Sequence, residues 1–263
     1  MPNASPCSAG HLVVRQLERS GVERVYCVPG ESYLDVLDGL HDSTIDTVVC
    51  RHEGGAGFMA VAEGRLTGRP GVVMVTRGPG AANAAIAVHT AWQDATPLVL
   101  FVGLVPAEQR YREAFQEFDP NAWFGSTAKR VLVLDDPASA AGVVAEAVHV
   151  AASGRPGPVV VGLPETTLTE PTDGVTLPPR APARPAPSPA DLDAVAALLR
   201  DAQAPVVIAG GEGWTEQAAR DLAAWAEAAA LPVLTDFRAH DAIDHRSPCY
   251  AGSLGYGRSP SAA

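Results

Sequence analysis

The residues best suited to chemistry lie around Glu53, within the stretch 51–56 that reads RHEGGA. A short β-branched run precedes this stretch, and a run of small and apolar residues with helical spacing follows it at 58–66. We therefore expect Glu53 where a strand ends and a helix begins, the edge of an open parallel sheet where ligands bind. A carboxylate there can act as a general acid or base. An equally good explanation is a purely structural role, in which the carboxylate complements the helix dipole and the free N–H groups of the first turn.

A second candidate follows the next predicted strand, where Gly78, Pro79 and Gly80 lead into a helix. Glycine lets a ligand approach the backbone closely, and a helix N-terminus presents free N–H groups. Asn83 comes about one turn later and should face the same opening. An ordinary strand–helix turn explains these residues equally well. The polar and aromatic loop 111–119 is a third candidate, because long loops often carry function, although it also fits a plain surface loop.

Other motifs are incomplete or absent. Gly210, Gly211 and Gly213 follow a predicted strand, as in a dinucleotide-binding fingerprint, but the spacing requires Gly or Ala at position 216, which is Glu. We therefore favour a tight turn there over a nucleotide-binding oxidoreductase. The sequence contains no GxSxG, Walker A or HExxH motif and no zinc-type spacing of Cys and His. We expect no metal ligands in this chain.

The elements that must position these residues alternate between strand and helix. Apolar, β-branched runs predict the strands, and apolar residues at helical spacing predict the helices between them. Strands are expected at 25–28, 47–50, 71–76, 97–102, 130–134 and 158–163, and helices at 8–20, 31–40, 53–66, 81–91 and 137–152. This alternation predicts an α/β fold with an open parallel sheet and helices on both faces.

Prolines divide the chain into two parts. Seven prolines between residues 171 and 189 cannot sustain a helix or a central strand, so this segment is expected to be an extended linker. We assign 1–170 to the first domain and 190–263 to a second, Rossmann-like α/β unit. Its expected elements are helices at 190–201 and 215–229 and strands at 205–209 and 231–235. Because so few elements bury little surface, we expect this unit to be incomplete.

Composition narrows the classes of function. The 263 residues are 47% hydrophobic, enough for a sizeable core, and the net charge of −11 argues against nucleic-acid or anionic membrane surfaces as partners. No apolar run approaches the ~18 residues that a membrane-spanning helix needs. The four cysteines form no CxxC pair, and the N-terminus has no signal-peptide pattern. We therefore expect a cytoplasmic protein with reduced thiols.

Five motifs occur in order at spacings close to those of one enzyme family. They are VPGE at 28–31, RHEGGA at 51–56, VTRGPGAAN at 75–83, AFQE at 114–117 and GRPGPV at 154–159. Together they resemble the large subunits of thiamine-diphosphate-dependent acetolactate synthases (acetohydroxyacid synthases). The resemblance is strong over about residues 8–170, the pyrimidine-binding domain of that family. Residues 190–257 resemble the first half of its central domain.

The resemblance implies roles for particular residues. In these enzymes a glutamate hydrogen-bonds the pyrimidine N1′ of the cofactor and favours the tautomer whose 4′-nitrogen takes the C2 proton. Glu53 stands at that position. Arg77 stands where a small hydroxyl residue is usual, and an added cation there can shift substrate preference. The motifs further imply cofactor-lining positions at Gly30, Pro79, Asn83 and Gln116, substrate-channel positions at Phe115 and Lys129, and at Arg155 a flavin contact found in members that contain FAD.

The implied reaction is decarboxylation of a 2-keto acid such as pyruvate, followed by carboligation to a second carbonyl. The family holds its magnesium ion and the cofactor's diphosphate with a Gly-Asp-Gly…Asn motif, and the sequence has no Gly-Asp-Gly. The resemblance therefore implies a homodimer or tetramer, or a partner chain with the diphosphate-binding domain. The alternative is a non-catalytic or split-subunit half that only binds such a partner.

Overall fold

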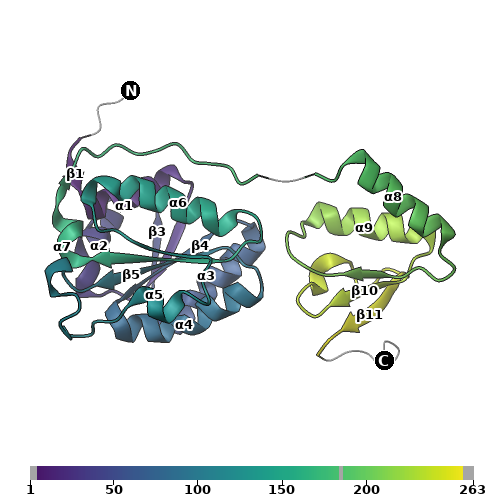
Figure 1. Cartoon of the computed structure of the whole chain (residues 1–263), viewed down its shortest axis with the longest axis horizontal. Coiled ribbons are helices and arrows are strands. Elements are labelled where there is room, and N and C mark those ends of the chain that lie inside the picture. Colours follow the sequence, from purple (N-terminus) through teal and green to yellow (C-terminus); the bar gives the residue numbers. More distant parts are fainter. Residues whose placement is uncertain (1–4, 184–185, 257–263) are drawn as a thin grey trace. The chain divides into compact units, whose positions relative to one another are not determined.

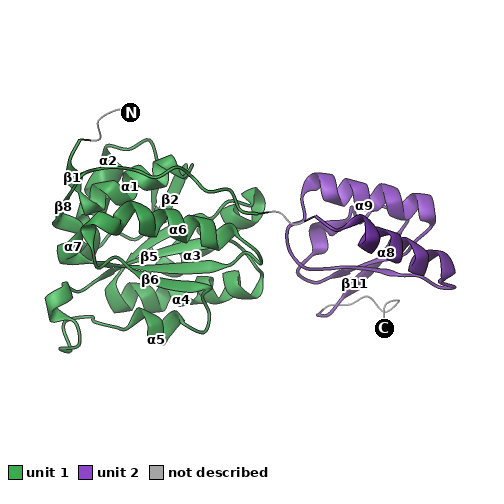
Figure 2. Ribbon diagram, turned by 45° about the horizontal axis from the view of Figure 1, so that its top comes forward, with its two compact units in different colours: residues 1–183 green, residues 184–263 purple. Residues whose placement is uncertain are grey.

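The computed structural model of the chain describes residues 5–183 and 186–256, and it consists of two compact units, 1–183 and 184–263 (Figures 1 and 2). The boundary between the units lies inside the segment that the prolines predicted as a linker. Each unit is an α/β structure with its own sheet, and each is described separately.

Unit 1 is built on a six-stranded sheet in which every strand is parallel to its neighbours, as the alternation of elements predicted. The strand order is β3-β2-β4-β5-β7-β6. Every residue of the central strands β5 and β7 is buried, which explains their continuous apolar sequences. The strands are β2 (Arg24–Cys27), β3 (Asp46–Val49), β4 (Gly71–Thr76), β5 (Leu98–Leu104), β6 (Arg130–Val133) and β7 (Pro158–Pro164).

Helices cover both faces of this sheet (Figure 2). Successive residues of a strand point to opposite faces, so Val72 and Met74 belong to one core layer and Val73 and Val75 to the other. The first layer is closed by α1 (Ala9–Arg19), α2 (Leu34–His41), α6 (Ala140–Ala152) and α7 (Glu165–Thr169). The second is closed by α3 (Glu53–Thr67), α4 (Arg77–Gln93) and α5 (Pro120–Phe124). Short 3-10 turns are η1 (Glu31–Tyr33), η2 (Ala107–Gln109) and η3 (Pro137–Ser139).

Residues 173–183 of the proline-rich segment contain no helix or strand, and the first part of the segment is attached to unit 1. Strand β8 (Pro171–Thr172) pairs antiparallel with β1 (Cys7–Ser8). Farther along, the buried side chain of Gln16 accepts a hydrogen bond from Leu177 N (2.7 Å) and donates one to Leu177 O (3.1 Å). Prolines predict an extended chain but do not reveal which surface it follows, because that depends on a partner in another element.

Unit 2 contains a three-stranded parallel sheet in the order β11-β10-β9. Its elements are α8 (Pro189–Asp201), β9 (Val207–Ala209), α9 (Glu216–Ala229), β10 (Val233–Asp236), η4 (His240–Ala242) and β11 (Tyr250–Leu254). The expectation of only two strands was wrong, since β11 is a third. Its sequence YAGSL has no β-branched residue and contains Gly252, so the pattern gave no strand signal.

None of the helices in the described parts of the chain is long and apolar enough to span a membrane.

We predict that Gly71→Ala destabilises unit 1, because a Cβ at Gly71 would lie 1.9 Å from Ala60 O. The backbone of α3 must then shift, and the free energy of unfolding should fall by about 2–3 kcal/mol. Urea denaturation followed by circular dichroism measures this. Gly142→Ala is the matched control: its Cβ meets nothing within 4 Å, and in helix α6 it should raise stability by up to about 1 kcal/mol. Equal effects of the two substitutions would contradict the packing argument.

Candidate active site

The half-buried side chain of Glu53 lies at the first residue of α3, directly after the carboxyl end of β3. His52 caps this helix, because its Nδ1 accepts a hydrogen bond from Gly54 N at 3.0 Å. With the cap supplied by His52, the Glu53 carboxylate turns toward α4, where Oε2 accepts a hydrogen bond from Asn83 Nδ2 at 2.9 Å. The two residues that the sequence singled out are thus brought together.

Helix α4 begins four residues earlier than the sequence indicated, so Gly78, Pro79 and Gly80 form its first turn. Gly80 lies against Glu53: a Cβ there would be 3.6 Å from Glu53 Oε1 and 3.1 Å from Val75 Cβ. Gly78 N donates a hydrogen bond to Gln116 O at 3.0 Å, which ties this turn to the 111–119 loop. Pro79 is exposed at the same edge. The structure therefore places Pro79 and the Gln116 backbone within the same group as Glu53 and Asn83.

Gly30 belongs to the same carboxyl edge, after β2. A Cβ at Gly30 would lie 2.4 Å from Thr76 Cβ, so any side chain would push the two loops apart. The nearby Ser32 and Thr76 hydroxyls are 2.7 Å apart and hydrogen-bonded. Tyr33, which sequence reasoning missed, is buried and donates from its hydroxyl to Val28 O at 2.5 Å. Burial raises the Tyr33 pKa, with smaller contributions from the charges of Cys27 and Glu53.

Arg77 connects three loops of this edge. Its side chain is only 10% exposed, and its guanidinium pairs with Glu31 (3.3 Å) and Glu165 (2.8 Å). Glu31 opens η1 and Glu165 opens α7, so the cation joins elements that follow β2, β4 and β7. Arg77 also has a φ of 35°, a conformation that costs energy for a residue with a side chain. We infer that these ion pairs hold the first turn of α4 in place.

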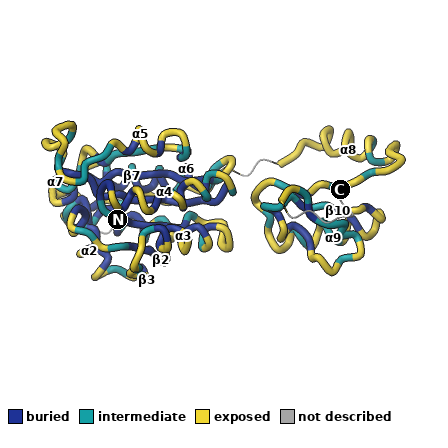
Figure 3. The backbone as a smooth tube through the Cα atoms, turned by 90° about the horizontal axis from the view of Figure 1, so that it is seen from below, coloured by how far each residue is buried: buried dark blue, intermediate teal, exposed yellow. Residues whose placement is uncertain are grey.

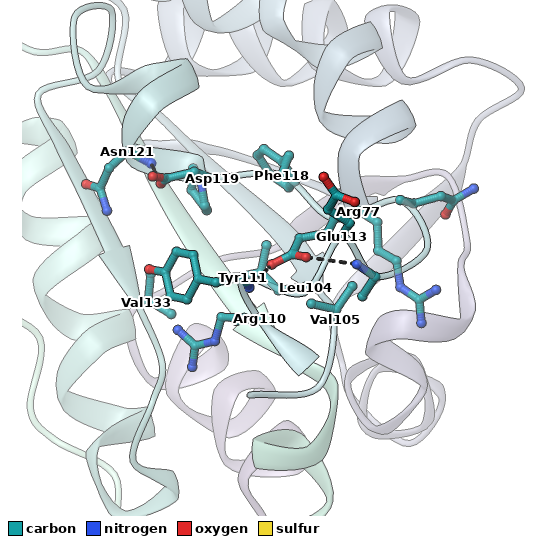
Figure 4. A pocket seen from close by; sticks show the side chains of 14 residues that line it. Arg77, Leu104, Val105, Arg110, Tyr111, Glu113, Phe118, Asp119, Asn121 and Val133 are labelled. Carbon is teal, nitrogen blue, oxygen red and sulfur yellow. Dashed lines mark hydrogen bonds between the residues drawn. The ribbon is translucent and has the colours of Figure 1, made fainter. Parts of the chain in front are cut away.

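The loop 111–119 lines a hollow of about 540 Å³ beside Arg77 (Figure 4). Tyr111 and Glu113 of this loop line its walls, together with Arg110 and Asn121 on either side of the loop. Phe115 lies on this loop and is 73% exposed. The loop thus brings both polar and aromatic groups to the edge that carries Glu53.

Lys129 and Arg155 lie elsewhere, at the edge where the strands start. Lys129 precedes β6, and its Nζ donates to Val150 O and Ser153 O, both at 2.5 Å, at the end of α6. Arg155 donates to Trp92 O (2.8 Å) and Gln93 O (3.2 Å) at the end of α4. Burial and the Arg155 charge lower the pKa of Lys129. The two cations cap helix C-termini, and the structure does not bring them to Glu53.

No group of three or more His, Cys, Asp or Glu side chains in residues 5–183 and 186–256 is arranged to hold a metal ion.

Two domain families match this chain. The family described as thiamine pyrophosphate enzyme, N-terminal TPP binding domain, matches residues 7–123, and the thiamine pyrophosphate enzyme central domain matches residues 192–263. The chain belongs to the thiamine pyrophosphate enzymes, with an N-terminal TPP-binding domain in unit 1.

Its curated relatives are acetolactate synthases, as the five motifs predicted. The catabolic acetolactate synthase of Raoultella terrigena is 37% identical over 200 residues, covering 76% of this chain and 36% of the relative. The acetolactate synthase of Bacillus subtilis is 35% identical over 231 residues, covering 87% and 40%. The isozyme 2 large subunit of Escherichia coli is 32% identical over 253 residues, covering 92% and 44%. The chain thus spans less than half the length of these relatives.

We predict that Arg77→Ala lowers the free energy of unfolding of unit 1 by about 1–2 kcal/mol, because two hydrogen bonds between charged groups are lost while Glu31 and Glu165 become hydrated. Urea denaturation measures the change. Arg24→Ala is the control: Arg24 also pairs with a carboxylate, that of Asp46 at 2.8 Å, but its side chain is 46% exposed. It should have a much smaller effect. If the two variants lose the same stability, Arg77 does not hold the three loops together.

Proposed function

We propose that this chain supplies the pyrimidine-activating half of a thiamine-diphosphate site in an acetolactate-synthase-like enzyme that acts on 2-keto acids such as pyruvate. One observation carries the proposal: in a TPP-binding domain, the Glu53 carboxylate stands at the carboxyl edge of the sheet, held by Asn83 and facing Gly80. The edge is the place where open α/β sheets bind ligands.

The residues present fit the pyrimidine half of the cofactor. Asn83 occupies Glu53 Oε2, so Oε1, the oxygen on the Gly80 side, remains for the N1′ atom of a pyrimidine. Gly80 leaves space beside that oxygen where any other residue would place a Cβ. Gly30 and Pro79 line the same edge. We assign to these residues the binding and orientation of the ring.

When bound, thiamine diphosphate supplies a thiazolium carbon that becomes a nucleophile once its proton is removed. Glu53 holds a proton at N1′ through Oε1, and Asn83 fixes the orientation of the carboxylate through Oε2. The Gln116 backbone is fixed to Gly78. By family resemblance the Gln116 side chain would contact the cofactor, and Phe115 would line the path of the substrate. Arg77 lines the hollow at this edge, where its guanidinium is paired with Glu31 and Glu165.

The diphosphate and its Mg²⁺ need ligands from another domain, since no Gly-Asp-Gly occurs in this sequence. FAD is not part of this proposal, because Arg155 already donates to the carbonyls of Trp92 and Gln93. Lys129 is likewise given no role in the substrate channel, because its ammonium group caps α6 at the other edge of the sheet.

In this proposal the diphosphate-binding domain is contributed by another subunit or by a partner chain. The Glu53 edge is then a subunit interface in a homodimer, a tetramer or a complex with a partner chain. Apolar side chains on α3 and α4 support this arrangement: Phe58, Met59 and Ile86 are 43%, 44% and 56% exposed. Figure 3 colours the backbone by burial and shows exposed segments along the helices of unit 1. Gly55 adds a position on α3 where a backbone can approach freely, since a Cβ there meets nothing within 4 Å. Exposed apolar surface of this kind is typical of interfaces.

In an enzyme assembled from this chain and a chain carrying the Gly-Asp-Gly…Asn domain, Glu53→Gln keeps the shape of the side chain and removes its charge. We predict a loss of roughly 10²-fold or more in turnover, the scale of a lost acid–base contact. Exchange of the cofactor's C2 proton, followed by NMR, should slow in parallel. Glu170→Gln is the control: this exposed carboxylate follows α7 directly, and its substitution should change neither rate. Unchanged C2 exchange in Glu53→Gln would remove Glu53 from the mechanism.

We predict that the 263-residue chain alone does not bind thiamine diphosphate at micromolar concentration. The pyrimidine ring offers about nine atoms at roughly 0.3 kcal/mol each, or about 3 kcal/mol in total, which corresponds to millimolar binding or weaker. Isothermal titration with cofactor and Mg²⁺ measures this binding. Cofactor binding and carboligation should both appear when a chain carrying the diphosphate-binding domain is added. A micromolar dissociation constant would reveal a diphosphate site within the chain. If the cofactor binds after that chain is added but carboligation does not appear, the result would favour the alternative that this chain is a non-catalytic half.

A further inference from the structure

The loop between η2 and α5 adopts an unfavourable backbone conformation. Tyr111, Glu113 and Gln116 have φ values of 63°, 56° and 63°, and none of them is glycine. Residues with a side chain avoid this left-handed region unless other interactions hold them there. A group that fixes this loop must therefore be present.

That group is the Glu117 carboxylate. Its Oε1 accepts a hydrogen bond from Tyr111 N, and its Oε2 accepts one from Ala114 N at 2.9 Å. These hydrogen bonds, with smaller contributions from the backbone N–H groups of Arg112 and Glu113, lower the pKa of Glu117. The backbone of 111–114 thus forms an anion-binding concavity filled by a carboxylate of the same loop. Figure 4 shows how Tyr111 and Glu113 line the hollow at this loop.

The loop in turn contacts the first turn of α4. Gln116, the residue before Glu117, accepts a hydrogen bond from Gly78 N through its carbonyl oxygen. A Cβ at Gly78 would lie 3.0 Å from that oxygen, so the two segments are in close contact. Gly80, two residues farther along, faces Glu53 Oε1. A path of direct contacts therefore runs from Glu117 through Gln116 and Gly78 to the neighbour of Glu53.

We propose that Glu117 is a positioning residue: its carboxylate holds the loop so that the Gln116 carbonyl secures the Gly78-Pro79-Gly80 turn beside Glu53. In this proposal Glu117 acts through the Gln116 carbonyl and not on the reacting atoms. The hydrogen bonds of Glu117 are a feature of the structure and do not depend on the function, whereas their importance for catalysis rests on the proposed function.

Amide hydrogen exchange of the full 263-residue chain, resolved by NMR, tests this. The informative amide is Gly78 N, which is 39 residues from Glu117 in sequence and whose acceptor is Gln116 O. In Glu117→Gln the charged acceptor is lost, and exchange at Gly78 and at 111–114 should accelerate roughly tenfold or more. Amides of the central strand β5 should keep their rates, because the sheet does not depend on this loop. Glu117→Asp keeps the charge and should restore part of the protection.

Glu113→Gln is the matched control. It removes the same charge from the same loop, but the exposed Glu113 side chain accepts none of these amide hydrogen bonds, so exchange at Gly78 should not change. Unchanged exchange at Gly78 in Glu117→Gln would overturn the proposal, as would equal acceleration in Glu113→Gln. Acceleration of the β5 amides by the same factor would also overturn it, since Glu117 would then only stabilise the fold. The measurement needs neither cofactor nor turnover, so it can fail or succeed independently of the proposed function.

Discussion

The close approach of α3 and α4 is the constraint on which the site depends. A Cβ on Gly57 would lie 2.5 Å from Ala87 Cβ, and one on Gly54 would lie 3.3 Å from Asn83 O. Glycine and alanine at these contacts let the two helix backbones pack together, so that their first turns meet above the ends of β3 and β4. The hydrogen bond between Glu53 and Asn83 is a consequence of this spacing. Larger side chains on either helix would separate the two residues.

The parallel sheet determines which residues can act together. All six strands of the parallel sheet end at one edge, and the loops that carry Gly30, Glu53 and Gly78 start there. The strands begin at the opposite edge, where Lys129 and Arg155 satisfy carbonyl groups at the ends of α6 and α4. The charged residues at the two edges of the sheet therefore serve different purposes. The carboxyl edge holds exposed acceptors and open space, whereas the cations of the other edge are occupied by helix ends.

Much of the fold could be predicted because its signals are local. Continuous apolar runs such as 98–104 indicated buried parallel strands, and the alternation with helices indicated a parallel sheet with helices on both faces. The start of α4 and the strand β11 were missed. Arg77 begins α4 with a positive φ and pairs with two distant carboxylates, and YAGSL gives no strand signal of its own but pairs with β10. In both cases the conformation is imposed by contacts with distant residues.

The sequence alone determined the fold class, the family and the importance of Glu53, because the motifs and the hydrophobic pattern are written along the chain. Only the tertiary structure decided which partners those residues have. Asn83 is 30 residues from Glu53 and Glu165 is 88 from Arg77, and no local pattern reports such distances. The same limit applies to Glu117, which belonged to a recognised motif, AFQE, without any assigned role. Its role depends on backbone N–H groups that converge only after the loop folds. The sequence does not show where these N–H groups point.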